Sequence, residues 1–439
     1  MAEGATNKVR VEDAGAHNWY RFVLSFPPHL VREYLQTFGV VAGDTVLDPF
    51  CGTGTTLVEC KKLGIDSIGV EAHPMTHFAS AVKVDWTPDP DGLLEHANEV
   101  AQTVREELER DGIDDDRLYD PHSLFGGWNG GALRTLPESS RKLLLKNSIS
   151  PLPLHKTLVL LDKLNHGSPN SYRGHERLAL ARALVSRISN VRFGPEVGVG
   201  PAKPDAPMLS PWLFGVREMA EDLRELQEDE GTVATAHHAD SRSMLKVLEP
   251  ESVDAVITSP PYPNEKDYTR TTRLETILLG FVKDRPELQA LKQGLVRSNT
   301  RGVYKGDDDD LWVSGYPEIQ RIAEAIEARR IELGKTSGFE RLYGRVTKLY
   351  FGGMARHLAD LRRVLRPGAQ LAYVVGDQAS YLRVMIRTGQ LLGDIAESLG
   401  YELVGIDLFR TRLATATREQ LREEVVVLRW PGGNGAATP

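Results

Sequence analysis

The stretch Val46-Leu-Asp-Pro-Phe-Cys-Gly-Thr-Gly-Thr-Thr56 indicates the class of fold that this 439-residue chain adopts. An apolar strand runs into a glycine turn, and a helical pattern begins at once and continues to Leu63. A glycine turn at such a junction lets backbone amides at the start of the helix approach a ligand. We therefore expect a ligand site here. A nicotinamide cofactor is disfavoured, because its motif needs a third glycine at the position of Leu57.

Further apolar, β-branched runs alternate with helical patterns along the chain. The runs lie at Asp44–Asp48, Ser67–Glu71, Val253–Thr258, Gln370–Val375, Leu403–Phe409 and Glu424–Leu428. The helical patterns lie at Pro28–Phe38, Thr55–Leu63, Arg345–Leu365 and Leu391–Leu399. This alternation predicts an α/β fold, in which a mainly parallel, Rossmann-like sheet carries helices on both faces. The last two runs are close enough in sequence to form a hairpin, so we expect one edge strand to be antiparallel.

Two long stretches interrupt the alternation. We expect one sheet domain built from residues 1–86, 231–268 and 345–430, with insertions at 87–230 and 269–344 and a tail at 431–439. The first insertion opens with an acidic amphipathic helix and continues through the glycine-rich Phe125–Gly131. It then carries a run rich in Lys and Arg, Arg134–Arg192.

Composition and charge narrow the class of protein. With 41% hydrophobic and 26% charged residues, the chain is typical of a globular protein. No apolar run approaches the roughly 20 residues of a membrane helix, so we expect a cytoplasmic protein that does not enter a membrane. The net charge of -8 argues against a protein that simply coats nucleic acid. A local basic surface is still expected, because Arg134–Arg192 holds 11 Lys or Arg against 3 Asp or Glu.

No metal site is predicted. Cys51 and Cys60 lack the CxxC spacing of zinc sites. The tetra-aspartate Asp307–Asp310 lacks the alternating spacing and the glycine of a calcium loop, so we expect a solvated loop.

A second informative stretch is Val253-Asp-Ala-Val-Ile-Thr-Ser-Pro-Pro-Tyr262. It places a hydroxyl, two amides without N–H groups and an aromatic ring at the carboxyl end of a strand, where open α/β sheets bind ligands. Ser259 and the Pro260 carbonyl are suited to accept both hydrogens of an amino group while Tyr262 stacks on a planar ring. We therefore take Ser259, Pro260, Pro261 and Tyr262 as the candidate catalytic residues. Taken alone, Pro-Pro-Tyr is equally typical of a rigid turn that ends a strand.

Glu71 ends the strand that follows the glycine turn. An acid about 20 residues after such a turn is placed to accept hydrogen bonds from a ribose diol. The alternative is a strand-end glutamate that faces solvent.

Together, Asp48-Pro-Phe-Cys-Gly-Thr-Gly-Thr55 and Thr258-Ser-Pro-Pro-Tyr262 resemble the paired motifs of the amino-directed DNA methyltransferases, which modify N4 of cytosine or N6 of adenine. Weaker resemblances lie at His17–Phe22 with Phe26–Val31 (the family's N-terminal segment), Ala239–Arg242 (its third motif) and Leu365–Leu371 (the entry to its fifth strand). The resemblance covers roughly residues 17–86, 232–268 and 345–430.

This resemblance implies a methyltransferase sheet that uses S-adenosyl-L-methionine as cofactor. It assigns cofactor binding to residues of these motifs, namely Tyr20, Asp48, Pro49, Phe50, Gly52, Gly54, Thr55, Glu71 and Asp240. Within that set, Glu71 is expected to hold the ribose and Asp240 the adenine. A C5-cytosine methyltransferase is disfavoured, because neither cysteine follows a proline as that family's nucleophile does.

The resemblance implies that a base leaves the duplex and that its amino nitrogen attacks the methyl group directly. Ser259 favours N4 of cytosine over N6 of adenine. Two alternatives stay open: an RNA or protein amide methyltransferase, and a DNA-binding subunit with an inactive cofactor fold. The expected partner is double-stranded DNA, with a restriction nuclease as a further candidate, and the oligomeric state stays open.

Which insertion reads DNA also stays open, because the arrangement of motifs does not assign the chain cleanly to one of the family's standard orders. In the first insertion the candidate DNA-binding residues belong to the basic run, and they are Arg173, Arg177, Arg182 and Arg187. In the second they are Arg270 and Arg273. Such arginines grip backbone phosphates, which supply much of the affinity for DNA. The alternative is a solvated basic face.

Overall fold

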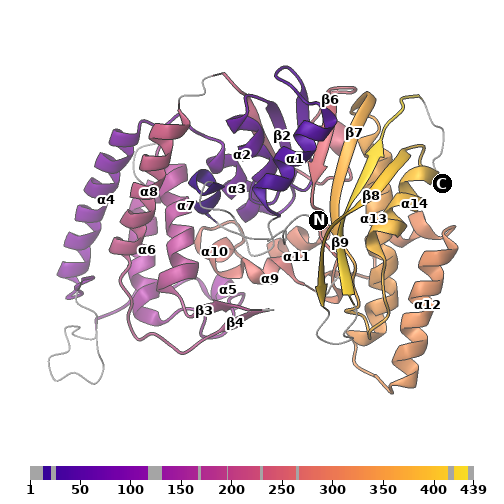
Figure 1. Cartoon of the computed structure of the whole chain (residues 1–439). Helices are drawn as coiled ribbons and strands as arrows, with labels where there is room; N and C mark the ends of the chain where they lie inside the picture. Colours follow the sequence, from indigo (N-terminus) through magenta and orange to yellow (C-terminus); the bar gives the residue numbers. More distant parts are fainter. Residues whose placement is uncertain are drawn as a thin grey trace.

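The computed structural model describes residues 13–20, 26–116, 131–166, 170–194, 196–227, 231–263, 266–413 and 420–433. At its centre lies a seven-stranded sheet in the order β5-β2-β1-β6-β7-β9-β8 (Figure 1). Its strands are β1 Thr45–Asp48, β2 Asp66–Glu71, β5 Ala234–His238, β6 Val253–Thr258, β7 Leu365–Gly376, β8 Glu402–Leu413 and β9 Gln420–Arg429. The strands from β5 to β7 are parallel, which confirms the predicted α/β sheet.

The last two runs form the predicted hairpin, and the edge strand β8 pairs antiparallel with its neighbour β9. The antiparallel strand is β9, which pairs with β7 on one side and β8 on the other, so that β8 takes the edge. The burial of the two strands gives the reason. The apolar run Val425–Leu428 is buried on both faces, as an interior strand requires, whereas Val404 and Leu408 of β8 are exposed.

Helices cover both faces of the sheet, as predicted. These helices and the short turns beside them are η2 Gly15–Asn18, α1 Pro28–Phe38, α2 Thr55–Lys62, α3 Pro74–Lys83, η4 Met244–Lys246, α13 Tyr343–Leu361 and α14 Thr388–Ser398. Adjacent residues of one strand point to opposite faces. Val46 packs with residues of α1, and Leu47 packs in the cluster that contains α13 and α14.

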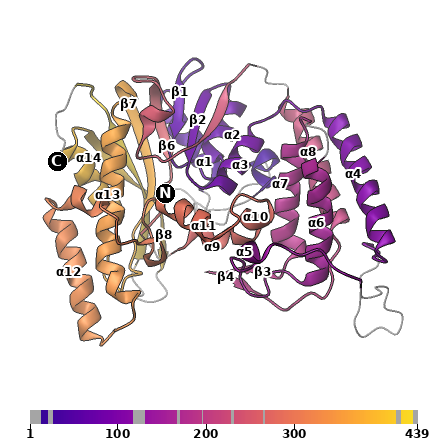
Figure 2. The ribbon, with the colours of Figure 1, turned by 180° about the vertical axis from the view of Figure 1, so that it is seen from behind.

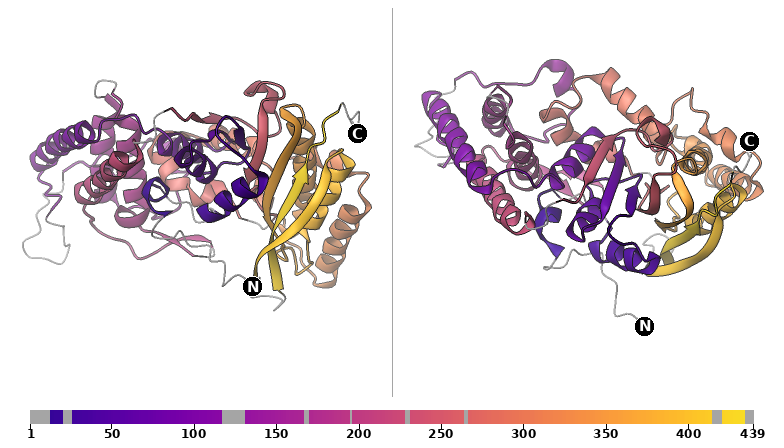
Figure 3. Two further views of the ribbon diagram at one scale, coloured as in Figure 1. Left: turned by 45° about the horizontal axis from the view of Figure 1, so that its top comes forward. Right: turned by 90° about the horizontal axis from the view of Figure 1, so that it is seen from above.

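The first insertion folds as a helical group beside the β5 end of the sheet. Its elements are α4 Pro90–Arg110, α5 Glu138–Arg141, α6 Pro151–His166, α7 Arg173–Ala183, the π-helical turn η3 Leu184–Ile188, β3 Val191–Phe193, β4 Val197–Val199 and α8 Leu209–Leu226. The acidic amphipathic helix expected at its start is α4. The glycine-rich Phe125–Gly131 lies outside the described residues except for Gly131. Both views of Figure 3 place these helices at the opposite end of the molecule from β8 and β9.

The second insertion begins beside the first insertion and continues to α12, which packs on the outer side of α13 (Figure 2). Its elements are α9 Tyr268–Thr271, α10 Arg273–Leu278, α11 Arg285–Gly294, η5 Thr300–Gly302, η6 Asp309–Val313, α12 Pro317–Glu332 and η7 Glu340–Leu342. In Figure 1, α9, α10 and α11 lie below β2 and β6. Within the described parts of the chain, no helix has both the length and the apolar character needed to cross a bilayer.

Candidate active site

A cavity of about 490 Å³ opens at the carboxyl ends of β1, β2 and β6. Its walls come from parts of the chain that lie far apart in sequence. They include Pro49–Thr53 after β1, Glu71–His73 after β2, Ser259–Tyr262 after β6 and Gly294–Asn299 from the second insertion. This edge is where open α/β sheets bind ligands, so the cavity is the candidate active site.

The four predicted catalytic residues, Ser259–Tyr262, all line this cavity. The hydroxyl of Ser259 donates a hydrogen bond to the carbonyl of Val374 at 3.2 Å. Because its single hydrogen is directed at that carbonyl, the oxygen of Ser259 is left as an acceptor. Burial raises the pKa of Tyr262, so its ring stays neutral.

Glu71 lines the cavity and does not face bulk solvent as the alternative required. Its carboxylate accepts hydrogen bonds from the backbone amides of Gly52 at 2.9 Å and His73 at 2.7 Å. These amides favour the charged form, but burial outweighs them and raises the pKa of Glu71 to about 7. The glycine turn and the acid after β2 therefore meet at one point.

Several other predicted cofactor residues also line the cavity, namely Pro49, Phe50, Gly52, Thr55 and Asp240. The ring of Phe50 stands edge-on to that of His357, with the ring centres 4.8 Å apart. Burial lowers the pKa of His357 to about 4, so its ring is neutral. Its Nε2 lies 2.7 Å from the hydroxyl of Tyr373, which fixes the imidazole behind Phe50.

Asp48 does not reach the cavity, and its assignment as a cofactor ligand is corrected. Its buried carboxylate accepts hydrogen bonds from the hydroxyls of Thr56 at 2.7 Å and Thr258 at 2.6 Å. Burial raises its pKa to about 6. Asp48 therefore joins β1 to the start of α2 and to the end of β6, directly before Ser259.

Tyr20 and Gly54 also lie outside the cavity lining, and their role in cofactor binding stays a prediction. Tyr20 is buried, and its hydroxyl donates to the carboxylate of Glu275 in the second insertion at 2.5 Å. Gly54 has φ +83°, and a Cβ there would stand 3.0 Å from the Cβ of Ser80 on α3. Gly54 thus permits α2 and α3 to pack closely. Phe26, from the same N-terminal segment as Tyr20, does line the cavity.

Two arginines of the basic run have partners within the protein, and their role in DNA binding stays a prediction. Arg177 donates to a backbone carbonyl at 2.6 Å and lies over the rings of Phe78 and Phe281. Arg182 forms an ion pair with Glu218 at 2.6 Å. Helix α7 packs against α3 and α8, so much of its polar surface turns toward these partners.

The remaining candidate arginines differ in exposure. Arg187 is exposed, whereas Arg173 and Arg270 are half-buried. Arg273 donates from Nε to the carbonyl of Thr269 at 2.8 Å, so it too is engaged within the fold.

The tetra-aspartate is not the solvated loop expected from its composition. Asp309 is buried and forms an ion pair with Arg242 at 2.5 Å, and Asp307 pairs with Arg297 at 2.8 Å. Only Asp308 of the four is exposed.

Other cavity residues were missed by the sequence analysis. They come from the second insertion and from the last two strands, and they include Lys292, Arg297, Asn299, Gln378, Phe409, Arg410 and Glu423. Phe409 alone had a usable signal, since it ends a predicted strand. The others belong to no motif, and tertiary folding alone brings them to the site.

Comparison with known proteins finds similarity to DNA methyltransferases. A family model described as DNA methylase matches residues 6–80. The chain is 27% identical over 446 residues to the Type II methyltransferase M.BsoBI of Geobacillus stearothermophilus, covering 94% of this chain and 84% of that protein. It is 24% identical over 458 residues to the Type II methyltransferase M.AvaI of Nostoc sp., covering 94% and 86%.

Among solved structures, the rRNA methyltransferase aviRa from Streptomyces viridochromogenes aligns with a TM-score of 0.32 and 12% identity, covering 93% of this chain and 86% of that one. The fold assignment itself rests on the strand order and the parallel pairing described above.

Proposed function

We propose that the chain is an S-adenosylmethionine-dependent, amino-directed DNA methyltransferase and that it methylates N4 of cytosine in double-stranded DNA. Its similarity to a DNA methylase family model and to two Type II methyltransferases supports the proposal. The observation that carries this proposal is that Ser259–Tyr262 and Glu71 line the same cavity. One end of the cavity therefore offers an acceptor and an aromatic ring for a base. The other end offers an acid, Glu71, for a nucleoside.

The residues at the second end fit S-adenosylmethionine. Glu71 is a half-buried carboxylate at the end of β2, where an acid binds a ribose diol, and Asp240 lies at the same cavity for the adenine. Gly52 lines the cavity and has φ +52°, a conformation that residues with a side chain rarely adopt. When bound, S-adenosylmethionine supplies an activated methyl group.

The chain's own residues position and activate the base. The extruded base stacks on Tyr262, which returns about 1–3 kcal/mol of the cost of leaving the duplex. The amino group donates its hydrogens to Ser259 and to the Pro260 carbonyl, and these contacts strengthen as the nitrogen gains positive charge in the transition state. Ser259 is suited to this role because its own hydrogen is directed at Val374.

Cytosine is favoured over adenine because the first position of the motif is the neutral hydroxyl of Ser259. In related motifs, Asn or Asp at this position serves adenine, guanine or glutamine amines. The test is to incubate the enzyme with DNA and isotopically labelled S-adenosylmethionine and to analyse the digested nucleosides by mass spectrometry. Label in N4-methylcytosine supports the proposal, and label only in N6-methyladenine overturns the choice of base.

The affinity for S-adenosylmethionine is expected to depend on pH through Glu71. Its carboxylate accepts from the ribose hydroxyls only when deprotonated, and its pKa is raised to about 7. Affinity should therefore fall about tenfold as the pH is lowered from about 8 to about 6. Calorimetry across this range measures the effect. The variant Glu71→Gln should bind more weakly with a flat profile, and a flat wild-type profile would remove Glu71 from the ribose site.

For the DNA-binding surface we propose a patch at the small sheet of the first insertion, formed by Arg187, Arg192, Phe193 and Lys203. Arg187 and Arg192 are exposed, and within the described residues no carboxylate pairs with either. The two arginines lower the pKa of Lys203 by charge repulsion, after the larger effect of burial, so the three cations lie close together. Phe193 is 40% exposed beside them. Uncompensated positive charge of this kind matches the phosphates of DNA.

Changing Arg187 and Arg192 to Gln is expected to weaken DNA binding and to reduce its salt dependence by about two units of slope, one for each lost phosphate contact. The matched control is Arg224→Gln, because Arg224 already pairs with Asp91 at 2.5 Å. Titrations at several salt concentrations measure both slopes. If the double variant keeps the wild-type slope, the patch is a solvated face.

We also propose that a restriction nuclease with the same recognition site accompanies this enzyme. Support comes from similarity along 94% of the chain to proteins named Type II methyltransferases. DNA treated with the enzyme and S-adenosylmethionine should then resist that nuclease. Cleavage of the treated DNA at the same rate as untreated DNA would contradict the pairing.

A further inference from the structure

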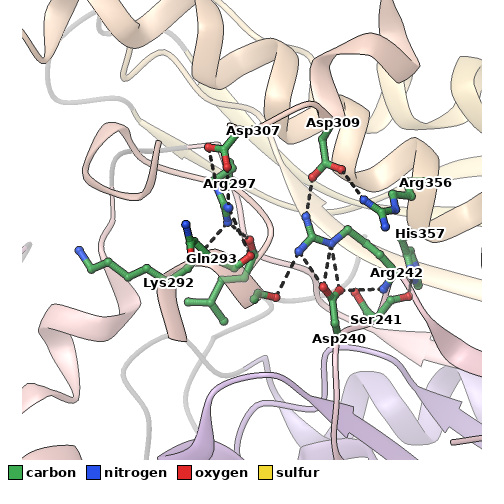
Figure 4. A network of polar contacts seen from close by, with 12 residues as sticks. Asp240, Ser241, Arg242, Lys292, Gln293, Arg297, Asp307, Asp309, Arg356 and His357 are labelled. Atoms are coloured by element: carbon green, nitrogen blue, oxygen red, sulfur yellow. Dashed lines mark hydrogen bonds and ion pairs between the residues drawn. The ribbon is translucent and has the colours of Figure 1, made fainter. Parts of the chain in front are cut away.

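A polar network links the cofactor end of the cavity to the tetra-aspartate of the second insertion (Figure 4). Asp240, which lines the cavity, is held by one guanidinium, that of Arg242. The Nε of Arg242 donates to Asp240 Oδ1 at 2.9 Å, and its Nη2 donates to Oδ2 at 2.7 Å. Arg242 itself is buried and lies outside the cavity lining.

The remaining end of that guanidinium is held by the second insertion. Its Nη1 donates to Asp309 Oδ2 at 2.5 Å, and Asp309 also accepts from Arg356 of α13 at 3.3 Å. Asp309 is buried, so its contact with Arg242 is little weakened by water. A planar guanidinium bound at both ends cannot rotate without breaking one pair. Asp309 therefore fixes Arg242, and Arg242 fixes the carboxylate of Asp240.

A second arginine, Arg297, binds the end of α11, next to the cavity-lining residues Gly294–Asn299. Arg297 donates to the carbonyl of Lys292 at 2.8 Å and to Asp307 at 3.0 Å. Arg242 likewise reaches the carbonyl of Gly294 at 3.3 Å. Both arginines thus contact the C-terminal carbonyls of α11, where positive charge is favourable. The residues that follow α11 line the cavity beside Asp240.

We propose that Arg242 and Asp309 are positioning residues for the cofactor: the second insertion, through Asp309, orients Asp240 and thereby sets the affinity for the adenine of S-adenosylmethionine. This rests on the proposed role of Asp240 in cofactor binding. The roles follow from placement, since Asp240 reaches the cavity, whereas Arg242 and Asp309 act from behind it.

The chain offers a matched pair of variants for the test. Asp309→Asn removes the charge that holds Arg242, and Asp308→Asn makes the same change at the exposed neighbouring position. Asp309→Asn should weaken S-adenosylmethionine binding about tenfold or more, as expected for a lost charge-assisted contact. Turnover at saturating cofactor and the affinity for DNA should stay within about twofold of wild type. Asp308→Asn should match wild type throughout.

A second readout separates positioning from general damage. Wild-type enzyme should prefer S-adenosylhomocysteine to S-inosylhomocysteine, which has an oxygen in place of the adenine amino group, by about tenfold. Arg242→Lys keeps the positive charge but loses the planar fork of the guanidinium. In Asp309→Asn and in Arg242→Lys, the ratio of the two affinities should approach one. If Asp309→Asn is unstable, Arg242→Lys carries the test.

The outcomes distinguish the two proposals. Wild-type protein that binds neither ligand would overturn the proposed function itself. Wild-type protein that binds both, with Asp309→Asn and Arg242→Lys retaining its preference for the adenine ligand, would overturn the positioning role alone.

Discussion

Replacing Ser259 by alanine is expected to lower turnover by about 100- to 1,000-fold, the range seen when one preorganised polar contact to a developing charge is removed. The hydroxyl lies in the cavity with its hydrogen directed at Val374, so the variant loses an acceptor that the substrate amine needs as it becomes positive. The turnover number is measured with both substrates saturating. Ser380→Ala is the matched control, since Ser380 lines the same cavity but lies outside the predicted catalytic motif.

The same Ser259 variant should bind S-adenosylmethionine nearly as well as wild type, because the cofactor is held at the Glu71 end of the cavity. Calorimetry checks this directly. A parallel loss of cofactor affinity and turnover would instead show that Ser259 maintains the shape of the cavity.

Gly54→Ala is expected to lower the free energy of unfolding by about 3 kcal/mol. About 1–2 kcal/mol comes from placing a Cβ in the left-handed region, and the rest comes from contact with Ser80. A Cβ at Gly54 would stand 3.0 Å from the Cβ and 3.2 Å from the Cα of Ser80, which is itself buried. Chemical denaturation measures the loss.

Gly52→Ala provides the control for backbone strain. Gly52 also has positive φ, at +52°, but a Cβ there would meet nothing closer than 4.0 Å. It should therefore cost only the conformational part, about 1–2 kcal/mol. Equal losses in the two variants would contradict a packing role for Gly54.

Most of the fold was predictable because hydrophobic pattern and turn chemistry agree in the sheet domain. The apolar runs that became β1, β6 and β7 are bounded by clear turn residues, so their identity as strands followed from local sequence. Strand β5 was missed because Ala234–His238 is half-exposed and ends in two histidines. The position of β9 was also missed, because a hairpin pattern does not reveal on which side its second strand pairs.

Part of the candidate site was predictable from the sequence, and part was not. Ser259–Tyr262 and Glu71 meet because the carboxyl ends of neighbouring parallel strands lie at one edge, which topology predicts. Asp48 and Gly54 belong to the same glycine motif, but they contact neighbouring strands and helices and do not line the cavity. The sequence alone does not show which residues of the motif line the cavity and which pack inside the fold. Arg177 turned inward because its partners lie on other elements, which only the folded chain brings near.

A structure of the enzyme with S-adenosylhomocysteine and a DNA duplex that contains its recognition site tests the central claim most directly. The account predicts the ribose at Glu71 and a cytosine turned out of the duplex against Tyr262. The amino group of that cytosine should lie within hydrogen-bonding distance of Ser259 and the Pro260 carbonyl. A target base that stays stacked in the duplex, or a cofactor bound away from Glu71, would contradict the account.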